Sequence, residues 1–458
     1  MKNILKFNIL IILAVALIFS GCKKWIDTDL NIDPDQPADV PMSLLLPSIE
    51  ASSAYTIGGN TAVRTSNIWM QFFDGVDRQS LTEGRYQINS ADVNDLWENC
   101  YAQSMMDCKN LIIKAEEKES PYFDGIAKVM LALNLGTLTD FYGDLPYTEA
   151  FKGAEANLSP VYDTQESIYT SIDGLLAEAI ADFGAADNAV DPGSEDLIYG
   201  GDISMWTKAA YALRARYAFY KGDNVNALTY IGNSFLGDTL SRHYDKFNMA
   251  FESGSNQNPI YQFMRDRTDI RMGSTFMNML INNADPRLPF YAATDVSGSY
   301  SGSDPGSENA LASKPGIYNA DEASPVLFSS YAEMKFIEAE IKLNTSPDEA
   351  LTAFKFGVMA SVDDVAGRDQ LWLDTTILNV TVSDLDLEMI ITEKYKAMYS
   401  TVIPYDDYRR TGFPVLQTVL GATAAAVPNR FPYPQSEITY NPNTPSAVPL
   451  TTKLWIFE

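Results

Sequence analysis

Histidine is nearly absent from this sequence: His243 is the single histidine among 458 residues. Zinc sites built from several imidazoles, and metalloprotease helices with paired histidines, are therefore excluded. A catalytic relay that needs two imidazoles is excluded for the same reason. Much of the common chemistry of enzymes is thus missing from this chain.

Basic residues are also scarce. Lys and Arg together number 33 against 60 Asp and Glu, which gives a formal net charge of −27. Nucleic-acid binding depends on attraction between basic side chains and phosphates, and here that attraction would be repulsion. We therefore expect no nucleic-acid partner.

Cysteine occurs three times, as Cys22, Cys100 and Cys108. The spacing of Cys100 and Cys108 on one expected helix places them about 12 Å apart. A disulfide cannot bridge that distance. We expect both to be packing residues of the core.

The sequence has no apolar run long enough to span a bilayer, which takes about 20 residues. The run Ile9 to Phe19 is shorter, follows two lysines, and is typical of a secretory signal. Small residues at Ser20 and Gly21 stand directly before Cys22, and this ending resembles the lipobox of bacterial lipoproteins. A lipobox implies cleavage before Cys22 and attachment of a lipid to its thiol, with palmitate among the acyl chains. The alternative is ordinary secretion with an unmodified Cys22.

Three regions follow from this interpretation. Residues 1–21 are expected to be the signal peptide, residues 22–60 a lipid-anchored tether rich in Pro, Asp and Ser, and residues 61–458 the folded domain. Several acyl chains hold a protein at a membrane without any insertion of its body.

Apolar residues recur at helical spacing in the folded region. From Trp97 to Ile112 they follow one helical face over several turns. The same pattern predicts helices at Ile126–Phe141, Ile168–Phe183, Trp206–Tyr220, Tyr331–Ile341, Leu351–Val358 and Leu387–Met398. Clear strand alternation is hard to find, so the fold class is all-α with at most short strands. No strict repeat of about 34 residues is present, so periodicity suggests paired helices without proving an array.

Two long stretches lack helical periodicity, residues 250–330 and residues 411–450. They carry Gly, Ser, Asn, Pro and scattered aromatics. Irregular segments of this length inside a helical scaffold are more often binding loops than filler.

Distinctive strings are spread along the chain at Leu30–Pro37, Tyr142–Ala150, Tyr331–Glu340, Asp407–Pro414 and Arg430–Glu437. Together with the lipobox, they resemble the starch-utilisation-system D-like, or SusD/RagB, family of nutrient-binding outer-membrane lipoproteins. The resemblance covers essentially the whole mature chain.

This resemblance implies a scaffold of tetratricopeptide-like helix pairs, exposed at the cell surface on the outer membrane. It implies a partner, a TonB-dependent (SusC-like) transporter barrel, and capture of oligosaccharides, or in some branches of peptides, without alteration of the ligand. No cofactor is implied.

The residues of these strings also have an ordinary structural explanation. Gly143 and Pro146 end a helix, while Glu333 and Lys335 lie on the polar side of another. We expect the strings to hold the fold together and not to mark the ligand site.

A sugar ligand needs aromatic rings for its CH faces and polar groups for its hydroxyls. The candidates by residue type are Trp69, Phe72, Phe73, Asp74, Arg78, Tyr86, Tyr291, Tyr300, Tyr318 and Trp372. For every ring the alternative is burial between helices, most of all for Trp69, Phe72 and Phe73, whose spacing also fits a helix face.

One string imitates a metal site. Asp27–Asp33 looks like the start of a calcium loop, but the sixth position is Ile32 where Gly is required and the twelfth is Ala38 where Glu is required. We expect no metal site.

Three functions compete at this point. The first is a binding lipoprotein for oligosaccharides or oligopeptides, the second a surface glycosidase, which needs two carboxylates and no histidine, and the third a purely structural lipoprotein. The chain has no Gly-x-Ser-x-Gly elbow, no phosphate-binding Gly-x-x-x-x-Gly-Lys loop and no acid pair that the sequence singles out. We therefore expect a binding protein and no enzyme.

Overall fold

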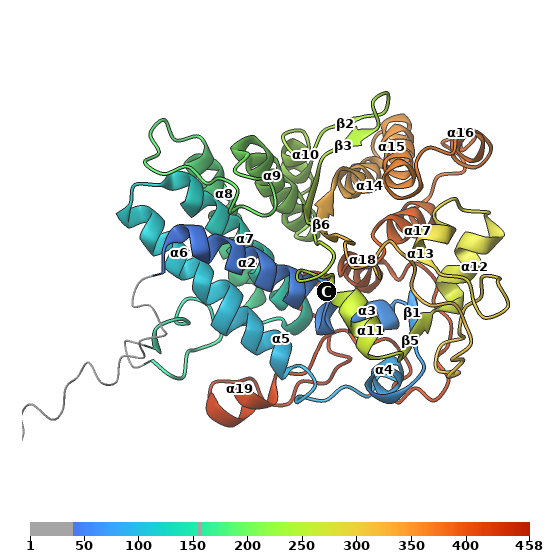
Figure 1. Cartoon of the computed structure of the whole chain (residues 1–458), viewed down its shortest axis with the longest axis horizontal. Helices are drawn as coiled ribbons and strands as arrows, with labels where there is room; N and C mark the ends of the chain where they lie inside the picture. The colour runs from blue at the N-terminus through green and yellow to red at the C-terminus, as the bar shows by residue number, and fades with distance from the viewer. Residues whose placement is uncertain (1–39, 154–156) are drawn as a thin grey trace, which may run out of the picture. The chain divides into compact units, whose positions relative to one another are not determined.

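The computed structural model describes residues 40–153 and 157–458 (Figure 1). The expected signal peptide, the lipidation site Cys22 and the calcium-like string Asp27–Asp33 lie outside the described residues. The folded unit described below is Met42–Glu458.

The first described helix corrects one expectation from the sequence. Residues of the predicted tether form α2 (Met42–Gly58), whose Leu46, Ile49 and Ala54 are fully buried. The helix contacts α6 and α7 along the scaffold. Composition alone suggested a tether because Pro and Ser are frequent there, yet the apolar residues of this segment are part of the core. The folded unit therefore begins before residue 61.

Each helix predicted from apolar spacing is present. The segment from Trp97 becomes α5 (Asn94–Glu98), a π-helical stretch η2 (Asn99–Met105) and α6 (Met106–Glu117) without interruption. The other six are α7 (Pro121–Tyr142), α8 (Gln165–Phe183), α9 (Ile203–Tyr220), α14 (Tyr331–Lys342), α15 (Pro347–Ala366) and α17 (Leu387–Ala397).

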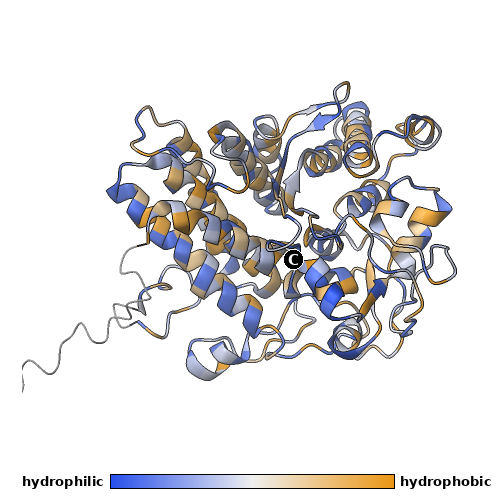
Figure 2. Ribbon diagram, in the orientation of Figure 1, coloured by the Kyte–Doolittle hydropathy of each residue, from blue (hydrophilic) through white to orange (hydrophobic). Residues whose placement is uncertain are grey.

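Neighbouring helices pack in pairs. Helices α6 to α9 and α10 (Asn224–Ile231) contact one another in chain order, and α14 packs against both α15 and α17 (Figure 1). Figure 2 shows alternating orange and blue stretches along these helices, as amphipathic helices have. Local signals place their ends: the Ser330 hydroxyl accepts a hydrogen bond from the Glu333 amide at the start of α14, and Gly143, with φ of 81°, ends α7.

The strands are short, as expected, and the structure pairs them antiparallel. They pair as β1 (Phe73–Gly75) with β5 (Ile270–Met272), β2 (Gly237–Asp238) with β3 (His243–Tyr244), and β4 (Lys246–Met249) with β6 (Val326–Ser330). The register of the third pair sets Lys246 opposite Ser330.

Shorter helices lie between these elements, and some of them fall inside the two irregular stretches, most of whose residues form turns and loops. They are α3 (Thr61–Trp69), α4 (Arg78–Gly84), α11 (Pro259–Asp266), α12 (Ser274–Asn282), α13 (Leu288–Tyr291), α16 (Gln370–Trp372), η4 (Leu373–Ile377), α18 (Ile403–Thr411), α19 (Gln435–Tyr440) and η5 (Trp455–Phe457).

Segments distant in sequence meet in an aromatic core. The Phe72 ring stacks on Tyr395 with centroids 3.9 Å apart, and the Trp69 ring lies edge-on to Tyr405 and Phe431 at 5.5 and 5.2 Å. Such pairs contribute about 0.5 to 1.5 kcal/mol beyond the area they bury.

Two further expectations concern cysteines and the membrane. Cys100 and Cys108 are fully buried free thiols, which confirms their assignment to the core. Within the described part of the chain, no helix has the length and apolar character needed to cross a bilayer.

Candidate ligand-binding groove

Two adjoining pockets share Lys246, Tyr318, Leu327 and Asp364 in their walls. The inner one has a volume of about 20 Å³ and the outer one of about 300 Å³. We call them together the Tyr318 groove. Their walls come from β4, β6, the end of α15 and the irregular segment 315–325, so this part of the fold brings together residues that are far apart in sequence.

Tyr318 supplies the central aromatic ring of the groove. Its side chain is half-buried and lies edge-on to Tyr291, with ring centroids 5.0 Å apart. Its amide donates a hydrogen bond to the Phe290 carbonyl at 2.9 Å, which positions the residue. Burial raises the pKa of the Tyr318 hydroxyl, so that group stays a protonated donor. Among the described residues the hydroxyl has no hydrogen-bond partner.

Polar groups line the same wall. The Lys246 ammonium lies 2.6 Å from the Asp364 carboxylate, and both side chains are 36% exposed. The half-buried amide of Asn248, two residues along β4, has no hydrogen-bond partner in the described part of the chain. Asp321 is exposed at the outer pocket. The groove therefore offers unsatisfied donors and acceptors beside an aromatic ring.

A pair of stacked tyrosines lines the inner pocket. Tyr244 and Tyr331 lie with centroids 5.5 Å apart and an interplanar angle of 30°. The Tyr244 hydroxyl donates to Asp363 at 2.7 Å, and burial raises its pKa. Asp245, which also lines this pocket, is buried and accepts from the Lys208 ammonium at 2.8 Å.

This arrangement suits binding more than catalysis. A ring face, an amide, a hydroxyl and an exposed ion pair match the alternating apolar and polar surfaces of a sugar. Among residues 40–153 and 157–458, no cluster of three or more His, Cys, Asp or Glu could hold a metal ion.

The structure corrects several of the predicted ligand contacts. Trp69, Phe72, Phe73 and Tyr291 are at most 1% exposed and present no ring face to a ligand. The Trp69 indole N–H donates to the Glu83 carbonyl at 2.9 Å. Trp69 and Phe73 belong to α3 and β1, in which every residue is buried, and Phe72 lies between these two elements. Tyr291 is the buried residue of α13, whose Pro289 is exposed.

Three more candidates are buried as well. Asp74 accepts hydrogen bonds from the Ser303 hydroxyl at 2.5 Å and the Gly306 amide at 2.8 Å, and it ties the 303–306 turn to β1. Tyr86 packs edge-on to Trp69, and the Trp372 indole N–H donates to the Asn283 carbonyl at 2.8 Å. Their polar atoms serve the fold.

Arg78 and Tyr300 remain accessible but do not line the groove. Arg78 is exposed and its guanidinium pairs with buried Asp269, with Nε 3.0 Å from Oδ1. Tyr300 is half-buried in an irregular loop. Tyr318 is thus the one sequence-predicted residue that the structure places in the groove.

Sequence reasoning missed the polar residues of the groove, namely Lys246, Asn248, Asp321 and Asp364. One signal was available: polar and apolar residues alternate from Lys246 to Met249, and the structure places Phe247 and Met249 in the core. That alternation predicts a strand with one polar face. Asp364 could not be found this way, because only the packing of α15 brings it to β4.

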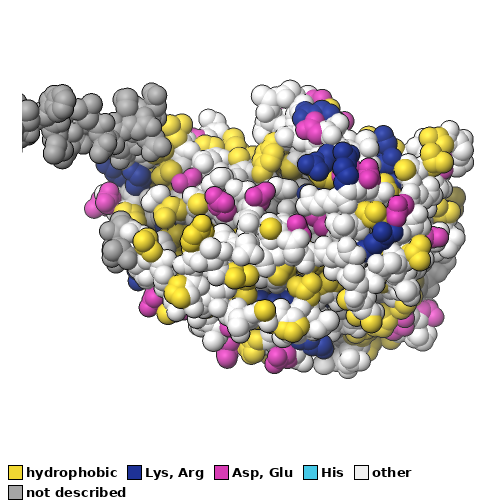
Figure 3. Space-filling model, turned by 90° about the horizontal axis from the view of Figure 1, so that it is seen from below, with side chains coloured by type: hydrophobic (Ala, Val, Ile, Leu, Met, Phe, Trp, Pro, Cys, Tyr) yellow, Lys and Arg dark blue, Asp and Glu magenta, His cyan; other side chains and the backbone are white. Residues whose placement is uncertain are grey.

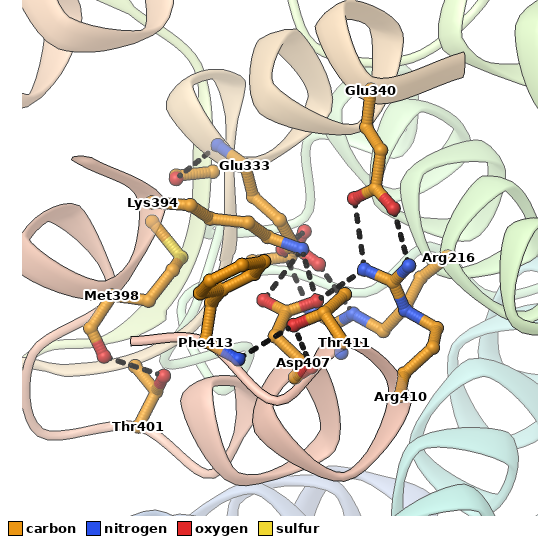
Figure 4. A network of polar contacts seen from close by, with 12 residues as sticks. Arg216, Glu333, Glu340, Lys394, Met398, Thr401, Asp407, Arg410, Thr411 and Phe413 are labelled. Atoms are coloured by element: carbon orange, nitrogen blue, oxygen red, sulfur yellow. Dashed lines mark hydrogen bonds and ion pairs between the residues drawn. The ribbon is translucent and has the colours of Figure 1, made fainter. Parts of the chain in front are cut away.

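Two of the distinctive strings, Tyr331–Glu340 and Asp407–Pro414, meet elsewhere, in a buried network (Figure 4). The string Leu30–Pro37 lies outside the described residues. Glu333 was expected on the polar side of its helix, but it is fully buried and pairs with Arg216 at 2.6 Å. Asp407 accepts from buried Lys394 at 2.9 Å and from Arg410 at 3.1 Å. Arg410 also reaches Glu340 of the other string, at 2.8 Å. These contacts join α9, α14, α17 and α18, so these two strings hold the scaffold together.

The chain matches one family model, described as "Starch-binding associating with outer membrane", over residues 34–434. No curated protein matches it. Among solved structures, a SusD/RagB family protein from Bacteroides thetaiotaomicron VPI-5482 is 22% identical with a TM-score of 0.75, covering 88% of this chain and 95% of its own.

Two further structures have the same fold. A chitin-binding SusD homolog from Flavobacterium johnsoniae is 20% identical with a TM-score of 0.78, covering 91% of this chain and 98% of its own. A SusD homolog from Bacteroides uniformis ATCC 8492 is also 20% identical, with a TM-score of 0.75 and coverage of 91% and 98%. The helix-pair scaffold is therefore that of the family, and the chain belongs to the SusD-like (SusD/RagB) family of nutrient-binding proteins associated with the outer membrane, which bind their ligands and do not catalyse reactions.

Proposed function

We propose that this protein captures oligosaccharides in the Tyr318 groove at the cell surface and passes them unaltered to a TonB-dependent transporter of the outer membrane. The observation that carries the proposal is the half-buried Tyr318 ring in a pocket of about 300 Å³, which is also lined by the Asn248 amide, a group with no hydrogen-bond partner among the described residues. Ligand sites typically measure about 300 to 1,000 Å³ and combine apolar walls with a few polar groups.

The first ligands to examine follow from the family and its solved structures. The family description names starch, and the Flavobacterium johnsoniae homolog is described as chitin-binding. Oligomers of glucose and of N-acetylglucosamine are therefore the first probes.

An oligopeptide is the second candidate. The exposed Lys246–Asp364 ion pair offers one charge of each sign, which a peptide could use through its own charged groups. A short panel of peptides belongs in the same binding experiment, and peptide binding without sugar binding would replace the first proposal.

The groove is tested by replacing its ring. Tyr318→Ala removes the stacking surface, and we expect the affinity for the bound oligosaccharide to fall at least about tenfold. Isothermal titration calorimetry measures the affinity, and mass spectrometry of the ligand afterwards checks that it is unaltered. Asn248→Ala should weaken binding less, because it removes hydrogen bonds alone.

The matched control is Tyr440→Ala, since Tyr440 is 79% exposed and does not line the groove. Wild-type affinity of the Tyr318→Ala protein would place the ligand elsewhere. In that case Arg78→Ala and Tyr300→Ala, at the accessible residues predicted from the sequence, are the next variants.

We also propose that a lipid on Cys22 anchors the mature chain. Support comes from the lipobox-like ending before Cys22 and from the family's association with the outer membrane. Mass spectrometry of the N-terminal peptide should find an acylated Cys22, and Cys22→Ser should release the protein from the membrane fraction. An unacylated mature N-terminus would contradict the anchor.

The transporter partner is tested in native membranes. Purification of the tagged protein after mild cross-linking should bring down a TonB-dependent barrel. A tagged lipoprotein of another family, handled in the same way, controls for general capture of outer-membrane proteins. Recovery of the protein alone would count against the partner.

A further inference from the structure

The Tyr318 groove is lined by more acidic than basic side chains. Its described lining residues include the acids Asp245, Asp321 and Asp364 and the single base Lys246. Asp245 is neutralised from outside the groove by Lys208, at 2.8 Å. Lys246 is neutralised inside it by Asp364, at 2.6 Å. Asp321 is left as an exposed carboxylate for which the described residues provide no cation.

An anionic ligand therefore meets no free positive charge among the described residues that line the groove. To reach Lys246, a ligand carboxylate must displace Asp364 and leave that acid unpaired in the wall. It must also approach Asp321, and like charges at close range repel strongly. The net charge of −27 adds a weaker repulsion at long range, which salt screens beyond about 10 Å at 0.1 M.

An uncharged polyhydroxyl ligand is not repelled by these carboxylates and can bind to them. Its hydroxyl groups donate to the Asp321 and Asp364 carboxylates, which accept without losing their charge. The same hydroxyls accept from the Asn248 amide and the Tyr318 hydroxyl, which donate to no other group in residues 40–153 and 157–458. Hydrogen bonds of this kind, with one charged partner, are the stronger ones.

We propose that the Tyr318 groove selects uncharged oligosaccharides against polyanionic ones such as uronic-acid or sulfated glycans, with Asp321 and Asp364 as the discriminating residues. This inference rests on the proposed function of the groove as an oligosaccharide site.

The test compares oligomers of glucose, N-acetylglucosamine and galacturonic acid of equal length. With the mature wild-type protein at 0.1 M salt, we expect the galacturonic-acid oligomer to bind at least about tenfold more weakly than the better neutral oligomer. At 1 M salt the ratio of the two affinities should shrink, because the screening length falls to about 3 Å.

Two charge variants test the assignment to residues. Asp321→Asn and Asp364→Asn should each reduce the ratio, and Asp364→Asn should reduce it more because it also frees Lys246 for the ligand. Asp187→Asn is the control, since it removes one exposed negative charge outside the groove.

Each outcome has a distinct meaning. Neutral binding with the expected ratio, reduced in the two variants and not in the control, supports the inference. Neutral binding together with equal or tighter galacturonate binding, or a ratio that neither variant changes, overturns charge selection and leaves the proposed function standing. Absence of binding to all three oligomers overturns both.

Discussion

At the scale of single residues, Glu50 of α2 is an acid whose nearest ionisable neighbour is another acid. Its side chain is fully buried, and Oε2 accepts from the Leu197 amide at 2.8 Å while Oε1 has no partner. Burial raises the pKa of Glu50 well above its ordinary 4.5, and the charge of Asp196 raises it further. Glu195 acts in the same direction.

The raised pKa makes stability depend on pH. Between pH 4.5 and the folded-state pKa, the folded protein holds a proton that the unfolded chain has released. Stability due to this group therefore falls as pH rises through that window, by about 1.4 kcal/mol per pH unit. Glu50→Gln should remove this part of the slope and raise stability at neutral pH.

Urea unfolding of both proteins across that pH range measures the effect. At each pH, the free energy of unfolding of the wild type is subtracted from that of the Glu50→Gln variant. The contributions of the other titrating acids cancel in this difference, and that of Glu50 remains. Glu388→Gln, at an exposed acid, should leave the difference near zero. If the free energy of unfolding changed with pH in the same way in Glu50→Gln and in the wild type, the raised pKa would not belong to Glu50.

The buried Arg216–Glu333 pair gives a second residue-scale prediction. Glu333→Gln keeps the shape of the side chain but leaves the Arg216 charge buried without a counter-charge, and we expect a loss of about 3 to 5 kcal/mol in the free energy of unfolding. Denaturant unfolding measures it. Glu349→Gln, at the exposed partner of Lys342, should cost less than about 1 kcal/mol. Similar small losses in both variants would show that the network is not needed.

At the scale of elements, Gly136 sets how closely α7 approaches α9. A Cβ at this position would lie 2.0 Å from the Tyr217 hydroxyl oxygen, on a buried ring of α9. Gly136→Ala must therefore shift one helix or the ring, and we expect a loss of about 1 to 3 kcal/mol, measured by urea unfolding.

Gly174 of α8 is the matched position, because no atom lies within 4 Å of its added Cβ. Gly174→Ala should stabilise the protein by about 0.5 to 1 kcal/mol through helix propensity alone. Equal effects of the two substitutions would show that contact with Tyr217 does not decide the outcome.

Some helices could be predicted from the sequence and others could not. Helices such as α8 and α9 follow from their own apolar spacing, since one stripe must be buried wherever they pack. In contrast, α2 was missed because a Pro- and Ser-containing segment has no signal strong enough to show its burial. Trp69 and Phe72 were placed at a site by residue type, although packing puts them in the core.

At the scale of the whole molecule, the dominant property is the net charge of −27. Figure 3 shows charged side chains scattered over one face, with hydrophobic and uncharged residues between them. Self-repulsion of this size destabilises the compact state.

Salt should therefore raise the melting temperature. Between 0.02 and 0.3 M ionic strength we expect an increase of about 1 to 2 °C for each kcal/mol of repulsion screened. Calorimetry with sodium chloride and potassium chloride measures it, and the two salts should act alike at equal ionic strength. A decrease, or a rise that depends on the identity of the salt, would exclude screening as the cause.

The order of residues along the chain was enough to determine the helical class, the positions of the long helices, the buried cysteines and the family resemblance. Each of these depends on neighbours along the chain or on short strings. The groove and the buried ion pairs depend instead on contacts such as that of the Asn67 amide with the Thr401 carbonyl, at 2.8 Å across most of the sequence. Only the tertiary structure could decide them, because burial and charge pairing are properties of residues that meet in space.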